Sequence, residues 1–501
     1  MRRARARTRT WTSVAAAFAV AASSGLARAQ STYRSSPVGG RSALMGGTGV
    51  ALARDGAGPF LNPATITHID DSGVAFSVNF YTVQWAALSG FHQPGPAGSS
   101  RYGALSLPNT ELDTSRADAL PSTLCLFLTI GSWGDNASQP ERDPRHRKGR
   151  RKLAACLGSL ERQNLSATAV GYAGSSGSLT STQATSVQRS WNRVYVGPSY
   201  SIYVSDRVAL GASLHGIGTT DSSTWSVDTL VYPGAGPASA SAYDTSLSAY
   251  SIDLAATLGM VWHVDDSQIL GASVSTPSLH VLGNANSTAG LQAGSNAQLS
   301  TSSGRFSAPP PMRVAIGVGS ETRRMRIEAD ASAYLPVTYL ARADLQTSQT
   351  ASTPAGTTSK SYASSLEVDG RPLVDAAFGV EGFVSSKISL LAGASLDFSA
   401  LEPLPLHPAI GTLAETRMQR AAASFGVGSY GDGSELLLGA ELSYAWGQSV
   451  AFDPYAATPG LALVDQRTVG LMFVIAGSAS LSAFRRTLRD LGDVVRFPKT
   501  P

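Results

Sequence analysis

The stretch from Arg324 to Leu335 reads Arg-Met-Arg-Ile-Glu-Ala-Asp-Ala-Ser-Ala-Tyr-Leu, with polar and apolar residues in alternation. Side chains of a β-strand point alternately to its two faces, so this period of two predicts a strand with one apolar and one polar face. The same alternation runs through 208–214, 388–398 and 435–446. A strand between lipid and a wet lumen needs such faces, but a soluble β-sandwich shows them too. Alternation therefore predicts an all-β chain without choosing between these two classes.

The lengths of the connections separate the two classes. We predict fourteen strands, at 73–85, 121–134, 153–173, 187–204, 207–219, 247–264, 268–276, 311–320, 324–335, 373–384, 388–398, 418–431, 434–446 and 468–481. Every second connection is short enough for a tight hairpin turn, at 205–206, 265–267, 321–323, 385–387 and 432–433. The others are long and rich in Ser, Thr, Gly, Ala and Pro, at 220–246, 277–310, 336–372 and 447–467. This asymmetry is typical of outer-membrane barrels. An even number of strands also places both termini of the chain on the short-turn, periplasmic side.

A weak repeat follows several of the tight turns. It reads Leu-Gly-Ala-Ser at 210–213 and 270–273, Ala-Gly-Ala-Ser at 392–395 and Leu-Gly-Ala-Glu at 438–441. A repeated hairpin indicates a meander that closes on itself, because closure leaves no backbone edge exposed to lipid. Propeller blades also repeat hairpins, but without this regular alternation of short and long connections. The predicted fold is a closed antiparallel transmembrane β-barrel of about 14 strands.

The composition also favours a barrel. Only 15% of the residues are charged, and 50 of 501 are glycine. A soluble protein this poor in charge is unusual, whereas a wall between lipid and a lumen needs less surface charge. Disorder fits poorly, because 43% of the residues are hydrophobic and they are patterned. No apolar run after the N-terminus is long enough for a transmembrane helix.

The N-terminus has the three parts of a secretory signal peptide. Basic residues come first, an apolar stretch follows at 14–22, and Ala27-Arg28-Ala29 forms a cleavage pattern. We expect cleavage to leave Gln30 first. The full chain has 39 Lys+Arg against 35 Asp+Glu, but six of its arginines lie in this signal. The mature chain is then close to neutral, which removes the argument for a nucleic-acid partner.

The segment 37–66, ahead of the first predicted strand, is rich in glycine. Glycine permits the tight, irregular backbone that a segment inside a lumen needs, and such backbone is tolerated at membrane depth when protein surrounds it. Asn62 before Pro63 favours a turn. The sequence therefore predicts a plug, with an extended periplasmic leader as the alternative.

This segment carries a resemblance to a known family. Gly39 to Asp55, followed by Asn62-Pro63-Ala64, resembles the N-terminal hatch of FadL/TodX-type outer-membrane transporters of long-chain fatty acids and other hydrophobic compounds. The motif spans about thirty residues, and the predicted architecture is similar over the mature chain. The resemblance implies a fourteen-stranded barrel plugged by its N-terminal segment. The plug residues that it singles out are Gly46, Gly47, Asp55, Phe60, Asn62, Pro63 and Ala64. A similar opening also occurs in related barrels that serve secretion systems.

These features divide the chain into four parts: a signal peptide (1–29), a plug (30–72), a barrel (73–481) and a periplasmic tail (482–501). The basic segment 135–152 falls where a short turn is expected. We interpret it as a solvated loop, with contact to anionic lipid or a protein partner as the alternative.

The last predicted strand carries Thr468, Gly470, Phe473 and Ile475. This spacing is similar to the sorting signal that ends many outer-membrane barrels, although here about twenty residues follow it. Apolar residues at helical spacing in that tail indicate either a short helix at the barrel mouth or a frayed end.

The chain shows no motif for catalysis, and we expect neither an enzyme, a cofactor nor a metal site. His68 and His263 each precede two aspartates, but a strand start or a turn explains both better than metal binding. Cys125 and Cys156 would lie in an oxidising compartment after export. Their predicted heights in neighbouring strands match poorly, so two unpaired thiols are favoured over a disulfide.

The polar face of the predicted strands should line the lumen. The candidates singled out are Arg207, His215, Arg326, Glu328, Asp330 and Glu441. Any barrel lumen is polar and holds paired charges, so these residues either form structural ion pairs or contact the plug or a ligand headgroup.

The expected function is passive transport of hydrophobic compounds, such as long-chain fatty acids, by a monomer embedded in the lipid of a bacterial outer membrane. One alternative is a non-transporting barrel that acts as a scaffold or secretion-system component. Another is a soluble, secreted β-protein.

Overall fold

The structure is a computed structural model, and it describes the chain in thirteen parts. These are residues 33, 37–69, 71–89, 110–116, 120–130, 147–175, 178–231, 239–293, 295–337, 339–368, 370–401, 416–453 and 460–483. The predicted signal peptide, residues 135–146 of the basic segment and residues 484–501 of the tail lie outside the described residues.

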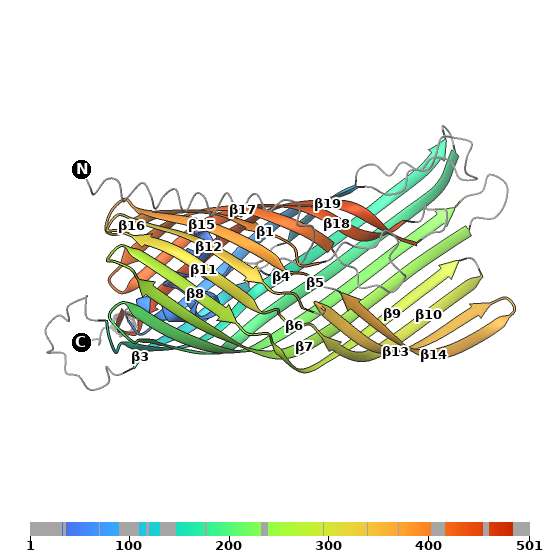
Figure 1. Ribbon diagram of the computed structural model, residues 1–501. Coiled ribbons are helices and arrows are strands. Elements are labelled where there is room, and N and C mark those ends of the chain that lie inside the picture. The colour runs from blue at the N-terminus through green and yellow to red at the C-terminus, as the bar shows by residue number, and fades with distance from the viewer. Residues whose placement is uncertain are drawn as a thin grey trace, which may run out of the picture.

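Fourteen strands form a closed wall (Figure 1). They are β1 (Gly73–Ser89), β3 (Leu120–Ile130), β4 (Arg151–Ser175), β5 (Ser178–Tyr203), β6 (Val208–Val231), β7 (Ser239–His263), β8 (Gln268–Ser275), β11 (Arg313–Glu321), β12 (Met325–Tyr334), β15 (Leu373–Phe383), β16 (Ile388–Asp397), β17 (Thr416–Gly431), β18 (Ser434–Asp453) and β19 (Gly460–Ser480). Each pairs antiparallel with the next, and β19 returns to β1 with Ser480 opposite Gly73. The predicted barrel of 14 strands is confirmed.

The faces of the wall follow the predicted alternation. On β12 the side chain of Met325 points outward and is 41% exposed, while Glu328 points into the lumen and is 2% exposed. On β18, Leu438 is 49% exposed and its neighbour Leu437 is buried. Apolar side chains therefore form the outer surface, as a lipid-facing wall requires, and a soluble sandwich with an apolar centre is excluded.

Five further strands extend the wall at one end: β2 (Thr110–Arg116), β9 (Leu279–Ala293), β10 (Asn296–Ser307), β13 (Ala341–Thr353) and β14 (Gly356–Val368). We call these strands the extension. β9 pairs with β7, and β10, β13 and β14 follow in that order. These four strands lie at the end of the barrel opposite the tight turns (Figure 1). The prediction of loops at 277–310 and 336–372 is wrong. Because most of β14 is exposed on both faces, its sequence shows no amphipathic alternation.

The extension joins the wall at prolines. Pro277 lies between β8 and β9, Pro309–Pro311 between β10 and β11, Pro336 between β12 and β13, and Pro372 between β14 and β15. Proline has no N–H to donate to a strand ladder, so at each of these four connections one strand ends and another begins.

The two cysteines form a disulfide, so the prediction of unpaired thiols is wrong. Cys125 lies directly opposite Cys156 in the β3–β4 pair, with their Cα atoms 4.2 Å apart. β3 ends at Ile130 and β4 begins at Arg151, both earlier than predicted, and this shift brings the cysteines level.

The helices of the described part are short: α2 (Arg41–Leu44), α3 (Gly58–Leu61) and η1 (Pro63–His68). None of the helices in this part of the chain is long and apolar enough to cross a membrane.

Candidate functional site: the plugged lumen

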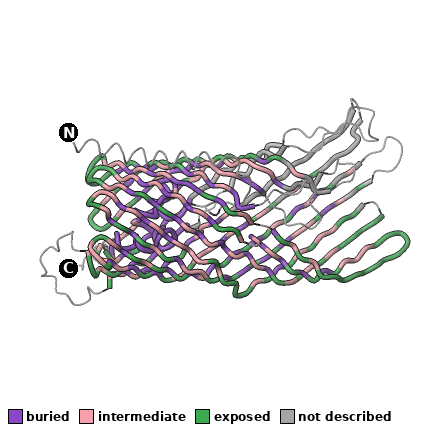
Figure 2. Tube along the Cα trace, viewed as in Figure 1, coloured by how far each residue is buried: buried purple, intermediate pink, exposed green. Residues whose placement is uncertain are grey.

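Residues 37–69 fill the barrel near its tight turns. Nearly all of them are buried, and they form the dense interior at that end (Figure 2). They pack on the wall through apolar clusters that include Leu44, Leu52 and Phe60. The predicted plug segment is therefore inside the lumen, rather than extended below the barrel.

Two polar side chains shape the plug from within. The carboxylate of Asp55 accepts hydrogen bonds from the backbone N–H of Ser42 at 3.0 Å and of Ala57 at 3.0 Å. Asn62 accepts from the N–H of Ala64 at 3.1 Å, and its Nδ2 donates to the carbonyl of Val50 at 2.6 Å. The Asn-Pro-Ala element thus caps η1, with Pro63 at a position whose missing N–H costs nothing.

Paired glycines turn the plug backbone against the wall. Gly46 and Gly47 have φ of 71° and 81°, a region that favours glycine. The N–H of Gly46 donates to Ser424 Oγ of β17 at 3.0 Å. The left-handed backbone and the close approach of wall backbone atoms, which would meet a Cβ at Gly46 within 3 Å, require glycine in this part of the plug.

The wall itself is cut back where the plug meets it. Glycines replace larger residues on the lumen face, and a Cβ added at any of them would collide with plug atoms. The clearest cases are Gly211, Gly259, Gly271, Gly317, Gly319, Gly379 and Gly393. Three members of the Leu-Gly-Ala-Ser repeat thus have a physical cause: their glycines make room for the plug. Ser213 and Ser273, two residues on, donate to the plug carbonyls of Pro59 and Leu61.

Two carboxylates of β12 hold the plug backbone. Asp330 Oδ2 accepts the N–H groups of Gly49 and Val50 at 2.8 and 3.0 Å. Glu328 Oε1 accepts those of Ala51 and Leu52 at 2.6 and 2.9 Å. Four successive amides that would otherwise be buried without partners are satisfied in this way. We call this pair of residues the carboxylate cradle.

A chain of alternating charges joins plug to wall nearer the tight turns. Arg54 of the plug bonds Glu321 at 2.5 Å, and Arg326 bridges Glu321 and Glu381 at 2.9 and 3.0 Å. Arg41 of the plug continues it, contacting Glu381 at 3.4 Å and Glu435 at 2.7 Å. We call these six residues the ion chain. Each charge has opposite-charge partners, which offsets part of the cost of burying it.

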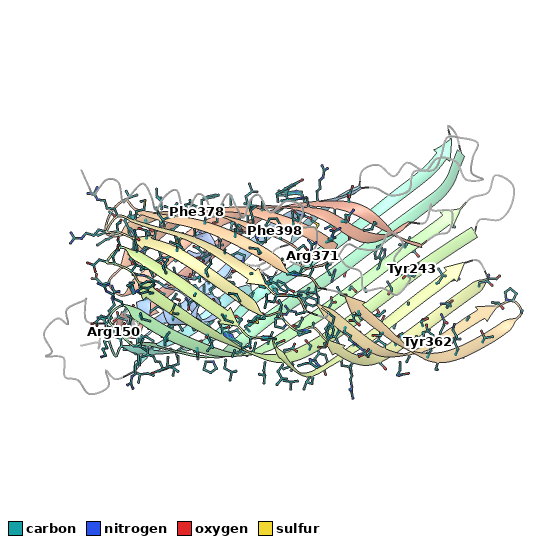
Figure 3. All side chains as sticks on the ribbon, viewed as in Figure 1. Arg150, Tyr243, Tyr362, Arg371, Phe378 and Phe398 are labelled. Carbon is teal, nitrogen blue, oxygen red and sulfur yellow. A yellow bond between two sulfur atoms is a disulfide. The ribbon has the colours of Figure 1, made fainter. Side chains whose placement is uncertain are left out.

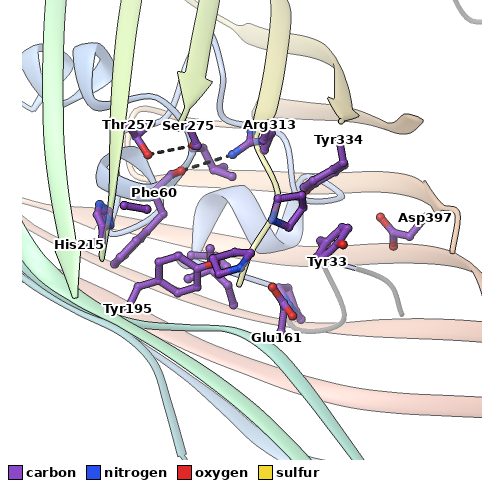
Figure 4. A pocket seen from close by; sticks show the side chains of 18 of the residues that line it. Tyr33, Phe60, Glu161, Tyr195, His215, Thr257, Ser275, Arg313, Tyr334 and Asp397 are labelled. Carbon is purple, nitrogen blue, oxygen red and sulfur yellow. Dashed lines mark hydrogen bonds between the residues drawn. The ribbon is translucent and has the colours of Figure 1, made fainter. Parts of the chain in front are cut away.

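A pocket lies directly against the plug, on the side facing the extension. It encloses about 970 Å³ of empty space, part of it open to solvent. Rings line one side: Phe60 of the plug stands edge-on to His215 and Tyr195, with centroids 5.2 and 6.4 Å away, and Tyr33 stacks on Tyr334 at 4.7 Å (Figure 4). The pocket can therefore take an apolar molecule in contact with both plug and wall.

Charged groups on the pocket wall are committed to one another. Arg193 donates from Nη1 to both oxygens of Glu161 at 2.6 and 2.7 Å, just behind the lining. Arg420 lies between Asp397, at 2.9 Å, and Glu441. Such closed ion pairs give the lumen its polar lining without presenting one sign of charge.

The structure thus gathers most of the residues singled out in the sequence. The plug residues line the pocket or the plug–wall contact, and His215, Arg326, Glu328, Asp330 and Glu441 lie on the lumen side. Arg207 does not line the lumen: it is exposed, in the turn between β5 and β6. Sequence reasoning missed Glu161 and Arg193. Alternation within β5 places Arg193 on the lumen face, but an irregularity between Ser159 and Glu161 shifts the phase of β4, so alternation alone does not place Glu161 there.

His68 and His263 form no metal site in the described residues, where no group of three or more suitable ligands occurs. Their rings face each other edge-on at 5.4 Å. Asp265 instead builds its turn, where the N–H of Ser267 donates at 2.7 Å and holds the pKa of that carboxyl below its usual range. Figure 3 shows Arg150 among the side chains at the tight-turn end of the barrel.

No protein-family model matches this sequence, and no curated protein sequence matches it either. Solved structures do match its fold. The crystal structure of a Pseudomonas aeruginosa FadL homologue aligns with a TM-score of 0.54 at 15% identity, over 90% of this chain and 100% of that one. The Pseudomonas putida toluene transporter TodX gives 0.52 at 15% identity, over 89% and 99%. The CymD monoaromatic hydrocarbon channel gives 0.50 at 12%, over 89% and 98%.

Proposed function

We propose that this chain is a passive outer-membrane channel for hydrophobic small molecules. The observation that carries the proposal is the ring-lined pocket built jointly by wall and plug, since Phe60 and Leu61 of the plug belong to its lining. A molecule held there touches the segment that blocks the lumen, so binding and plug position are coupled. The fold similarity to channels named for toluene and monoaromatic hydrocarbons is consistent with such a cargo.

The proposed transport is passive and needs no energy source other than the concentration gradient of the transported molecule. A hydrophobic molecule crosses the polar outer leaflet slowly, and a barrel with an apolar binding site provides a path along its concentration gradient. The extension would face outside and the tight turns the periplasm, as the asymmetry of loop lengths indicates. One barrel suffices, because the pocket lies within a single lumen.

The proposed cargo extends from long-chain fatty acids, suggested by the sequence resemblance, to compact aromatic compounds. The rings of Phe60, Tyr195 and Tyr334 favour the second class, because aromatic faces and edges attract one another beyond simple area burial. Uptake of both classes by cells expressing the chain decides between them.

Deletion of residues 30–66 tests the plug. The barrel should assemble, because its wall closes without the plug, and it should admit small hydrophilic solutes that the full chain excludes. The control is deletion of 350–359, at the exposed tip of β13 and β14. Uptake unchanged by the loss of 30–66 would contradict the role of the plug, and a stoichiometric protein partner with no bound hydrophobic compound would favour a scaffold instead.

A further inference from the structure

Two polar atoms of the pocket lining make no hydrogen bond in the described part of the chain: Nε2 of His215 and Oδ1 of Asp397. His215 of β6 lines the pocket and is 3% exposed. Its Nε2 is buried and makes no hydrogen bond with any residue in the described part of the chain. A buried polar atom without a partner is costly, so it calls for an explanation such as an ordered water, an ion or a ligand.

The ring of His215 is held in place by other rings. Its centroid lies 5.2 Å from that of Phe60 and 5.9 Å from that of Tyr195, both edge-on. Phe60 and Tyr195 are also edge-on to each other. A flat molecule that joins this cluster finds aromatic contacts on its faces and one nitrogen for a polar substituent.

Three other polar residues of the lining, Thr257, Ser275 and Arg313, are hydrogen-bonded within the protein. Thr257 Oγ1 and Ser275 Oγ lie 2.9 Å apart and bond each other (Figure 4). Arg313 Nη1 donates to the carbonyl of Phe60 and its Nε to Ser332 Oγ. His215 therefore keeps an unbonded ring nitrogen in the pocket lining, as Asp397 keeps an unbonded carboxylate oxygen.

An anionic ligand fits this site poorly. Three carboxylates, Glu161, Asp397 and Glu441, belong to the lining. Arg193 and Arg420, which neutralise them, are committed to those contacts. The lining also holds Arg313, whose guanidinium donates to Ser332 and to the carbonyl of Phe60. A carboxylate headgroup would have to displace those contacts, break an ion pair or lie among like charges.

We infer, on the basis of the proposed channel function, that the pocket selects neutral aromatic compounds bearing one hydroxyl group, with Nε2 of His215 as the residue atom that hydrogen-bonds it. The cargo class is then narrower than hydrophobic compounds in general. A phenol can donate to a bare ring nitrogen or accept from a protonated one, so either tautomer of His215 serves.

A matched series of ligands tests this on the full-length barrel in detergent. The probes are p-xylene, p-cresol and p-toluate, which differ only in a methyl, hydroxyl or carboxylate group, with Kd measured by titration calorimetry near pH 7.5. One neutral hydrogen bond should make p-cresol bind about five-fold tighter than p-xylene. Binding of p-toluate should be weaker than that of both.

Substitution then assigns the preference to His215. His215→Phe keeps the ring contacts and should bring p-cresol down to or below the affinity of p-xylene, whose own binding is retained. His215→Gln should keep part of the preference, and His280→Phe, a histidine outside the pocket lining, should keep all of it. Heat-modified gel mobility confirms that each variant is a folded barrel.

The outcomes separate the two proposals. Binding of p-xylene and p-cresol with equal affinity, or a preference for p-cresol that survives His215→Phe, overturns the role of His215 and leaves the channel function standing. Binding of none of the three probes, with no uptake of hydrophobic compounds by cells, overturns the channel function and the ligand class together.

Discussion

The plugged end of the barrel and the extension are built from the same kind of hairpin but to different rules. Around the plug, wall glycines touch plug atoms and every wall charge discussed above has a partner. In the extension, β14 is exposed along most of its length, and the pair Arg342–Asp344 stands in solvent. The first region is fitted to one occupant, whereas the outer ends of β13 and β14 in the second region are largely exposed. Substitutions of the same chemistry should therefore have large effects in one region and small effects in the other.

The largest contrast is expected for an arginine. Arg41→Met removes one of the two plug arginines of the ion chain and leaves Glu381 and Glu435 each short of a partner, which should destabilise the docked plug by about 3–5 kcal/mol. Hydrogen exchange of backbone amides in 37–66 measures this as faster local opening. Arg342→Met in the extension should leave that exchange unchanged, because its ion pair is exposed. Equal exchange in both variants would refute the proposed role of the ion chain.

The carboxylate cradle gives the second contrast. Glu328→Gln combined with Asp330→Asn keeps the shape of both side chains but replaces each carboxyl group by an amide, whose NH2 cannot accept, at a cost of about 2–4 kcal/mol to plug docking. The amides of Gly49 to Leu52 should lose exchange protection first. Asp344→Asn is the matched change in β13, and it should leave the exchange rates of the Gly49 to Leu52 amides unchanged. Protection retained at 49–52 in the double variant would show that other contacts hold this segment.

Glycines offer a third, purely steric contrast. Gly259→Val places side-chain atoms where the Asn62 amide now lies, and overpacking of this kind costs about 1–3 kcal/mol. The plug should loosen, and single-channel recordings should show more frequent open events. Gly218→Val lies in the outer part of β6, where an added Cβ meets nothing within 4 Å, and should behave like the unchanged protein. Identical recordings from both valine variants would mean that the plug adjusts to Gly259→Val without moving.

The smallest effect is expected at the outer tip. Joining Gln349 to Lys360 through a two-residue Asn-Gly turn removes the exposed end of β13 and β14, where these two residues are already paired. Barrel stability should change by less than about 0.5 kcal/mol. Thermal unfolding of the purified barrel measures this, and a marked loss would show that the tip supports the wall.

The same contrast explains what the sequence could predict. Strands between lipid and lumen alternate between apolar and polar residues, so the sequence predicted the outward side of Met325 and the lumen side of Glu328. The tight turns predicted which strands form hairpins. The strand β14 has water on both sides and therefore no alternation to read. The glycines and Asn62 indicated a plug, but its partners depended on register. A sequence pattern placed Glu328 and Asp330 in the lumen without showing that plug amides meet them there.

The disulfide and the pocket show the same limit. A shift of a few residues in the ends of β3 and β4 decided whether Cys125 and Cys156 lie level. The pocket joins Phe60 to Tyr195 and His215, which are far apart in the chain, and only closure of the barrel brings them together.

The prolines between wall and extension have a consequence for how such a protein can change. An insertion of one residue in a continuous strand would turn every following side chain to the opposite face, exposing charges to lipid. Pro277, Pro336 and Pro372 interrupt the ladder between the extension and the wall. The change of side-chain phase caused by an insertion or deletion in the extension therefore does not pass these positions. The outer surface can therefore diversify, under pressure from phage or antibody for example, while the lipid-facing phase of the inner strands stays intact.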